Sequence, residues 1–352
     1  MLGCPGALDD FIKGNRSDSF LPYTESNLPD VIKGATLRSK FFRLQRVVLC
    51  NQKDVSDLEH GGKHLHLSGP GDNYFERINM LGRGKFGVVD RVFSRQTLQQ
   101  YARKVIHRGA SAWLDSRMCR QFESEIQALK KLSHPHIVKL VGSYTDQDHL
   151  GLIMTPIAEM DLNEYLRSPS IDPVLRKRCL RAYFGCLATA LAYLHQQDVR
   201  HNDIKPKNVL VKDSSVYFTD FGTSRSWGAE EGSTTIGEHE GFTQRYCAPE
   251  THETKGGRNR SSDMWSLGCV FLEMATVLLD RPLSDLDMFL EQNGTLRADA
   301  FWANPEAIGL WIKELRGPRG SSSTCDDSEV LAWTTELLQQ SPDDRPTAAQ
   351  LR

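Results

Sequence analysis

Residues Val199 to Gly222 read V-R-H-N-D-I-K-P-K-N-V-L-V-K-D-S-S-V-Y-F-T-D-F-G. The stretch places polar side chains on two short loops, namely those of Asp203, Lys205, Asn208 and Asp220. Apolar β-branched and aromatic residues flank each loop, as is typical of buried strands. We therefore expect these polar groups to meet at the mouth of one hairpin.

The order of these residues resembles two motifs of eukaryotic protein kinases. The set H-x-D-x-K-P-x-N, from His201 to Asn208, is similar to the family's catalytic loop, and D-F-G is similar to its magnesium loop. D-F-G begins twelve residues after Asn208, an arrangement that is very hard to obtain by chance. Lys205 makes the loop similar to that of serine/threonine rather than tyrosine kinases. The N-terminal segment and the sequence T-Q-R-Y-C-A-P-E, from Thr243 to Glu250, also resemble kinases of filamentous fungi.

The resemblance implies a role for each polar residue of the two loops. Moving the γ-phosphoryl group of ATP requires placement of the acceptor and neutralisation of charge on the phosphate oxygens. Asp203 would orient the substrate hydroxyl and accept its proton, and Lys205 would lie beside the transferred phosphate. Asn208 and Asp220 would supply oxygen ligands to Mg²⁺, a hard cation. ATP and Mg²⁺ are therefore the expected cofactors.

One residue of the catalytic loop departs from the family pattern. The family usually has an arginine before the catalytic aspartate, and that arginine commonly pairs with a phosphate on the activation segment, but this chain has Asn202. We therefore predict that activity does not depend on phosphorylation of the segment from Asp220 to Glu250 through that contact. Its serines and threonines are more often a polar loop than a regulatory site. Thr243 resembles the threonine that contacts the catalytic aspartate and lysine.

A glycine-rich motif, Gly82-Arg83-Gly84-Lys85-Phe86-Gly87, lies between two strand-like runs. Dinucleotide-binding folds place a similar motif between a strand and a helix, whereas no helical pattern follows it here. This context favours a hairpin whose backbone amides approach nucleotide phosphates over an ordinary glycine hairpin. The resemblance places these residues at the nucleotide: Leu81, Gly82, Gly84, Gly87 and Val89.

Lys104 lies on a predicted inner strand, Tyr101–Ile106, where an unpaired buried charge would be costly. The helix predicted from Gln121 to Leu132 by its apolar i, i+4, i+7 spacing offers Glu125 as the partner. This pair resembles the one that holds the α- and β-phosphates of ATP in active kinases. From the residues alone, a solvent-facing position for Glu123 or Glu125 stays open.

The strand predicted from His149 to Met154 leads into Thr155-Pro156-Ile157-Ala158, which resembles the hinge between the two lobes of a kinase. The resemblance implies that the backbone of Thr155 and Ile157 binds the adenine edge and that Met154 guards the pocket behind the base. It also places Ala102 and Leu210 at the nucleotide. Asp161 would reach a ribose hydroxyl, and a helix N-cap role for it is equally open.

Motifs nearer the C-terminus fit the same family. Glu250 of Ala248-Pro249-Glu250 would pair with Arg345, and Asp263 would accept hydrogen bonds from the backbone of the catalytic loop. Cys179–His195 and Glu329–Gln340 are predicted helices. The chain ends earlier than the family's last helix normally does, so we expect its final turn to be weak.

The implied fold is α+β with two lobes and ATP between them. The first is a small antiparallel sheet of five strands with one helix, and the second is larger and mainly helical. We predict a partly ordered N-terminal extension over residues 1–72 and a kinase domain over residues 73–352, with lobes at 73–155 and 159–352. Residues 280–325 should be irregular with some helix.

Within the extension, Leu37–Leu49 could form an amphipathic helix or strand. His60, His64 and His66 lie at a spacing that can bind a metal. Because no cysteine or carboxylate framework surrounds them, a solvated loop is the favoured interpretation. Ser68–Asp72 has the composition of a linker.

Composition limits the class of protein. The 352 residues are 39% apolar and 25% charged, as in soluble globular proteins, and the net charge of −2 predicts no general affinity for nucleic acid or membranes. The eight cysteines are scattered without a C-x-x-C pair, so a reducing compartment is expected, namely the cytoplasm with the nucleus as the alternative. No signal peptide or membrane-spanning segment is recognisable. We expect a monomer that acts on protein substrates carrying serine or threonine.

Three rival functions remain. A pseudokinase or scaffold that binds nucleotide without transfer would need damage at Lys104, Asp203, Asn208 or Asp220, and all four are present. A small-molecule phosphotransferase would not be expected to carry the A-P-E motif and a distant Arg345. A dehydrogenase fits the glycine motif alone.

Overall fold

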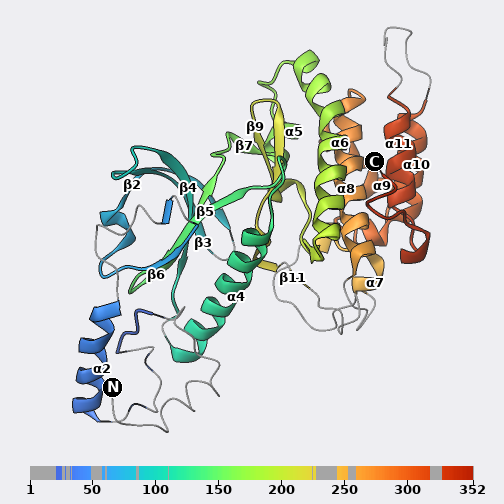
Figure 1. Cartoon of the computed structure of the whole chain (residues 1–352). Helices are drawn as coiled ribbons and strands as arrows, with labels where there is room; N and C mark the ends of the chain where they lie inside the picture. The colour runs from blue at the N-terminus through green and yellow to red at the C-terminus, as the bar shows by residue number, and fades with distance from the viewer. Residues whose placement is uncertain are drawn as a thin grey trace. The chain divides into compact units, whose positions relative to one another are not determined.

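The computed structural model describes residues 21–25, 28, 32, 34–48, 58–59, 62–84, 87–109, 111–223, 225–226, 244–252, 259–317 and 327–351. The chain divides into two compact units (Figure 1). The first unit contains the residues up to Lys131 together with Val138–Ile157. The second contains Leu132–Ile137 and the residues from Ala158 onward.

A six-stranded sheet forms the centre of the first unit. In spatial order its strands are β1 (His64–His66), β5 (Lys139–Thr145), β6 (His149–Thr155), β4 (Gln100–His107), β3 (Gly87–Ser94) and β2 (Phe75–Gly84). Strands β2 to β6 pair antiparallel, which confirms the predicted sheet. The additional strand β1 pairs parallel to β5 and was not predicted.

Two helices whose bounds lie within the described residues accompany this sheet, α2 (Ala35–Val48) and α4 (Ala112–Lys131). The sequence left both helix and strand open for Leu37–Leu49, and the structure forms helix α2 there. Helix α4, which packs on β5 and β6, begins nine residues before the predicted start at Gln121 (Figure 1). The reason is that the polar residues Asp115 and Ser116 occupy buried positions in its first turns. The spacing of apolar residues, on which the prediction depends, is therefore interrupted there.

The core of the first unit includes residues from the N-terminal segment. Leu58 and Leu67 are fully buried, and Leu65 nearly so, in one cluster with residues of the sheet such as Phe75 and Ile153. Each buried leucine contributes roughly 1.5–3 kcal/mol relative to an exposed one. Residues before β2 therefore help to stabilise the sheet.

The favoured interpretation of the histidines as a solvated loop was wrong for His64 and His66. Both lie on β1, where His64 Nδ1 is 2.9 Å from Ser143 Oγ and His66 Nδ1 is 2.7 Å from Thr145 Oγ1. Hydrogen bonding to β5 replaces solvation of the imidazoles. His60 lies outside the described residues.

The free energy of unfolding should fall as the pH is lowered from about 7 to 5, in part because of His64. Burial, followed by the charges of His66 and Lys130, lowers the pKa of this imidazole from 6.5 to about 3. The unfolded chain, with its ordinary histidine pKa, therefore binds a proton that the folded chain does not. This difference should cost the folded state roughly 1–2 kcal/mol at pH 5. Urea unfolding at both pH values measures it, and the fall should be smaller by that amount in His64→Gln. Equal falls in the two proteins would contradict the prediction.

The second unit is mainly helical. Its helices are α5 (Leu162–Arg167), α6 (Pro173–Gln196), α7 (Pro249–His252), α8 (Arg260–Leu278), α9 (Leu283–Asn293), α10 (Pro305–Leu315) and α11 (Glu329–Leu337). Helices α6 and α11 confirm the two predicted ones, and α11 packs against α8 (Figure 1). Helix α6 begins earlier than predicted because Asp172 caps it by accepting the Leu175 N–H at 2.8 Å.

Short strands connect these helices. They are β7 (Met160–Asp161), β8 (Val199–Arg200), β9 (Val209–Lys212), β10 (Ser215–Phe218) and β11 (Arg225–Ser226). Strand β9 pairs antiparallel with β10 and with β7, while β8 pairs with β11. Among the described residues, no single helix is long and apolar enough to cross a bilayer; α8 and α9 pass that test only together, with a bend of 118° between them.

Candidate functional site

A first group of predicted site residues lies on adjacent strands of the first unit. Val89 of β3 is paired with Lys104 of β4, and Ala102 of β4 is paired with Met154 of β6. Residues paired across antiparallel strands share a face of the sheet, as do residues two apart on one strand. The structure thus brings these predicted nucleotide residues onto one face.

Lys104 and Glu125 form a buried ion pair between β4 and α4. The Lys104 Nζ donates to Glu125 Oε1 at 2.8 Å and to Oε2 at 3.0 Å. The two side chains are only 10% and 2% exposed. A solvent-facing position for Glu125 is therefore wrong, and a cation is fixed on the inner face of the sheet.

The glycines of the β2–β3 hairpin differ in what surrounds them. Among the described residues, a Cβ at Gly82 would meet no atom within 4 Å, and one at Gly84 would meet only the Gly87 carbonyl at 3.9 Å. A Cβ at Gly87 would lie 2.1 Å from the Val105 carbonyl oxygen. The fold therefore requires glycine at 87, whereas the described residues leave space for a Cβ at 82 and 84. Lys85 and Phe86 lie outside the described residues.

This difference leads to a prediction for two alanine variants. Gly84→Ala should change the free energy of unfolding by less than about 1 kcal/mol, because its Cβ enters open space. It should raise the KM for ATP by about 5-fold or more, because a methyl group then occupies the approach to the phosphates. Gly87→Ala should instead lower the melting temperature. Thermal unfolding without nucleotide and ATP titration distinguish the two, and an unchanged KM in Gly84→Ala would argue against a nucleotide at this hairpin.

The predicted hinge follows the end of β6. Thr155 closes this strand opposite Lys139, and Pro156 and Ile157 follow outside any strand. Within the part of the chain that is described, no hydrogen bond uses the backbone N–H of Ile157. A planar base with a matching acceptor is the kind of ligand that this amide could bind.

A second group of predicted site residues lies in the second unit, on the loop between β8 and β9. Asp203 Oδ2 accepts hydrogen bonds from Lys205 Nζ at 2.6 Å and from Asn208 Nδ2 at 2.9 Å. Asn208 Nδ2 also donates to the Asp203 carbonyl at 2.8 Å. The structure therefore brings together three residues predicted for one catalytic loop, all of them largely shielded from solvent.

Asp220 is tied to this loop through its neighbour Thr219. The Thr219 N–H donates to the Asn208 carbonyl at 3.0 Å, and His201 Nε2 donates to the Thr219 carbonyl at 3.0 Å. Asp220 itself adopts a left-handed backbone conformation with φ of 63°, which aspartate tolerates better than most residues. The predicted metal ligands Asn208 and Asp220 thus belong to one connected backbone unit.

Asp263 on α8 organises the start of the catalytic loop, as predicted. Its carboxylate accepts the backbone N–H of His201 at 3.0 Å and of Asn202 at 2.9 Å. It also binds His195 Nε2 at 3.1 Å, a partner that was not predicted. Burial would raise the pKa of Asp263, but the bond and charge of His195, the charge of His201 and the Asn202 N–H together lower it. The carboxylate therefore stays ionised in a fully buried position.

Two further predicted nucleotide residues, Asp161 and Leu210, are paired between β7 and β9. Asp161 is the N-cap of α5: its side chain accepts the Glu164 N–H at 2.8 Å, and the Glu164 carboxylate accepts the Asp161 N–H at 3.3 Å. The N-cap alternative is thus confirmed. Contact with a ribose stays a prediction.

The predicted long-range pair between Glu250 and Arg345 is present. Arg345 Nη1 and Nη2 each bind one carboxylate oxygen of Glu250 at 2.8 Å. The pair joins residues 95 positions apart in sequence. Residues 227–243, which include the predicted contact residue Thr243, lie outside the described residues.

Comparison with known proteins gives a consistent result. A family model described as protein kinase domain matches residues 75–352. The serine/threonine-protein kinase nekl-2 of Caenorhabditis elegans is 30% identical over 291 residues, which are 80% of this chain and 73% of that protein.

Two further curated relatives are matched over a smaller part of their own length. The serine/threonine-protein kinase cds1 of Schizosaccharomyces pombe is 33% identical over 214 residues, covering 58% of this chain and 45% of that protein. The probable serine/threonine-protein kinase fhkD of Dictyostelium discoideum is 29% identical over 226 residues, covering 59% and 28%. The resemblance to kinases of filamentous fungi in particular stays a prediction.

Proposed function

Because the chain belongs to the protein kinase family and is a protein serine/threonine kinase, we propose that it uses ATP and Mg²⁺ to phosphorylate serine and threonine hydroxyls of protein substrates. The observation that carries the proposal is the arrangement around Asp203. Its Oδ2 holds both Lys205 and Asn208 at hydrogen-bonding distance. No described residue hydrogen-bonds to its other oxygen, Oδ1, which is left for a substrate hydroxyl.

In the proposed catalytic step, each of these residues has one role. Asp203 Oδ1 accepts the proton of the substrate hydroxyl as the hydroxyl oxygen attacks the γ-phosphorus of ATP, and ADP leaves with the electron pair of the broken bond between the γ-phosphorus and the β–γ bridging oxygen. Lys205, a cation beside Asp203, stabilises the negative charge of the transferred phosphoryl group. Lys104, oriented by Glu125, binds the α- and β-phosphates of ATP.

The donor set of Asn208 and Asp220 fits Mg²⁺. Asn208 uses its Nδ2 for Asp203, and no described residue hydrogen-bonds to its Oδ1. An amide oxygen and a carboxylate are hard ligands of the type that Mg²⁺ takes, with water and phosphate oxygens completing its shell. When bound, the ion neutralises charge on the phosphates.

The compartment and the substrates are part of the proposal. Among the described residues, the cysteines are free thiols, which supports a reducing compartment such as the cytoplasm or the nucleus. We propose a monomer that acts on protein substrates. A generic substrate such as casein or a basic protein is therefore the appropriate first acceptor.

The test is a transfer assay with the full chain, labelled ATP, Mg²⁺ and a generic protein acceptor. The expected result is incorporation of label into phosphoserine and phosphothreonine. No label should be incorporated when EDTA is added at the start of the reaction. ATP binding without transfer would favour the pseudokinase, and label on a small molecule would favour a metabolite kinase. Either outcome would overturn the proposal.

Activity should survive treatment with a protein phosphatase. Asn202, in place of the usual arginine, adopts a φ of 64° and donates its N–H to Asp263, and asparagine is one of the residues that tolerate this conformation. No arginine at 202 is present to pair with a phosphate. We expect the treated enzyme to keep at least roughly half of its activity relative to a sample given heat-inactivated phosphatase. A near-total loss would contradict the prediction.

A further inference from the structure

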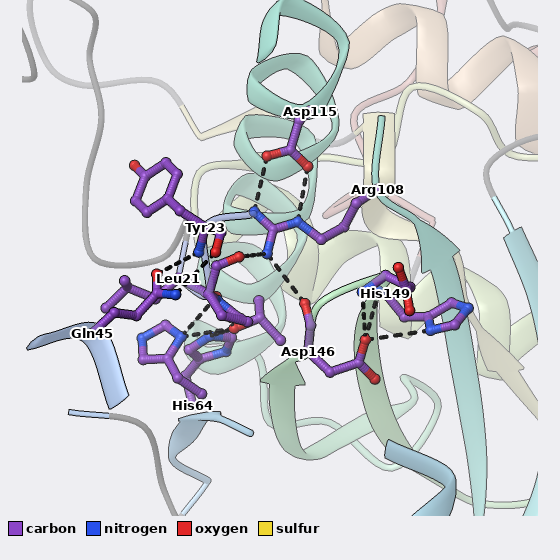
Figure 2. A network of polar contacts seen from close by, with 12 residues as sticks. Leu21, Tyr23, Gln45, His64, Arg108, Asp115, Asp146 and His149 are labelled. Carbon is purple, nitrogen blue, oxygen red and sulfur yellow. Dashed lines mark hydrogen bonds and ion pairs between the residues drawn. The ribbon is translucent and has the colours of Figure 1, made fainter. Parts of the chain in front are cut away.

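The junction between β4 and α4 contains a second buried ion pair besides Lys104 and Glu125. Arg108 follows the last residue of β4 and donates from Nε and Nη2 to the two oxygens of Asp115 on α4, each at 2.9 Å. The side chains of Arg108 and Asp115 are 3% and 0% exposed. Figure 2 shows this guanidinium lying between Asp115 and Asp146. The same strand and helix are thus joined at two points.

Arg108 also binds the N-terminal segment and the turn between β5 and β6. Its Nη1 donates to the Pro22 carbonyl at 2.6 Å and to the Asp146 carbonyl at 3.2 Å (Figure 2). A buried guanidinium with its planar fork holds its partners in fixed directions. The placement of the first turn of α4 therefore depends on residues near position 22.

The N-terminal segment is itself fixed on both sides of Pro22. The Tyr23 N–H donates to Gln45 Oε1 at 2.5 Å, and Gln45 Nε2 on α2 donates to the Tyr23 carbonyl at 2.9 Å (Figure 2). The Leu21 carbonyl accepts from Thr145 Oγ1 of β5. The Pro22 carbonyl is thereby presented to Arg108 in one position.

Helix α4 carries both Asp115 and Glu125. Asp115 and Glu125 are ten residues apart on one helix, about 15 Å along its axis. Between them Phe122 contacts the ring of His64 on β1, with centroids 5.9 Å apart. A Cβ at Gly109 would lie 2.3 Å from the Asp115 nitrogen, so the connecting loop packs directly on the first turn. A shift of that turn would move Glu125 away from Lys104.

We propose that Arg108 and Asp115 are positioning residues that keep Glu125 on Lys104, and that Leu21–Tyr23, fixed by Gln45, holds them in place. The N-terminal segment is then part of the catalytic machinery of the first unit. This inference rests on the proposed function, because the position of Glu125 affects activity only if Lys104 binds the phosphates of ATP. Neither Arg108 nor Asp115 contacts the reacting atoms.

The test uses point variants of the full chain. Asp115→Asn keeps the shape of the side chain and removes its charge. Gln45→Ala removes the two hydrogen bonds that hold the backbone of Tyr23, and Gln45 is distant from α4 in sequence. Two controls match them: Glu76→Gln breaks an exposed ion pair with Arg95 in the same unit, and Val92→Ala lowers stability through the core. Steady-state kinetics and hydrogen exchange over residues 112–131 are measured well below every melting temperature.

The expected result is a fall of about 10-fold or more in kcat/KM for ATP in Asp115→Asn and about 3-fold or more in Gln45→Ala, with KM for the protein acceptor unchanged. Exchange in α4 should become faster in both. Asp115→Glu, which keeps the charge, should recover part of the activity. The two controls should stay within about 2-fold of the wild type.

The inference would be overturned if Asp115→Asn and Gln45→Ala lost no more activity than Val92→Ala does for the same fall in melting temperature. Normal exchange in α4 of Asp115→Asn would also overturn it. If the wild type transfers no phosphate, the proposed function fails, and exchange still decides the positioning separately: faster exchange in α4 of both variants supports it, and unchanged exchange overturns it.

Discussion

Replacing Asp203 with asparagine should slow phosphoryl transfer by about 10²–10⁴-fold while leaving the fold intact. The variant side chain has the same shape, but its amide cannot accept the proton of the substrate hydroxyl. Lys205 and Asn208, which now donate to Asp203 Oδ2 at 2.6 and 2.9 Å, can still find an oxygen at the same place. The loss should therefore appear in kcat, with KM for ATP nearly unchanged.

Asp213→Asn is the matched control for this variant. Asp213 lies in the turn between β9 and β10 of the same unit, with a φ of 53° that asparagine also tolerates. Both variants should unfold within a few degrees of the wild type, and only Asp203→Asn should be inactive. If Asp203→Asn kept more than about a tenth of the wild-type rate, Asp203 would not be the base.

The parts of the site that the sequence predicted correctly are those in which chemistry and spacing are local. Asp203, Lys205 and Asn208 lie within one short loop, so the distances between them follow from the loop alone. The pairing of Lys104 with Glu125 was predictable for a different reason. A lysine on an inner strand requires a carboxylate nearby, and the next helix offers few.

What the sequence did not predict involves polar residues at buried positions. The start of α4 was missed because Asp115 replaces an apolar residue on its buried face, and its partner Arg108 lies outside the helix. Strand β1 is only three residues long and pairs with residues 79 positions away, which no local pattern encodes. Its histidines were therefore assigned to solvent.

The same limit applies to the residues that orient the catalytic loop. The acceptor Asp263 was predicted, but its partner His195 ends an apolar helix and carries no motif of its own. Thr219 contributes only backbone atoms to the link between the two loops, so its side chain gives no signal. Both become visible only when the distances are known.

Replacing Arg345 with methionine should lower the free energy of unfolding by about 3–5 kcal/mol. Arg345 is fully buried and uses all its N–H donors. Two bind Glu250 at 2.8 Å, and the others bind the carbonyls of Ser261, Gln339 and Gln340 at 2.8–3.0 Å. The variant would leave a partly buried carboxylate and three carbonyls without these donors.

Arg281→Met provides the control: Arg281 pairs with two carboxylates, those of Asp285 and Glu314, and lies over the ring of Trp311, as Arg345 lies over that of Trp265. Arg281 is 38% exposed, so water replaces its bonds and the expected loss is about 1 kcal/mol or less. Urea unfolding of both variants measures the difference. Equal losses would mean that the bond between Glu250 and Arg345 contributes no more than a surface ion pair. A larger loss in Arg345→Met, which removes only one ion pair, would show that burial and the bonds to carbonyls, rather than the number of ion pairs, decide the contribution of this arginine.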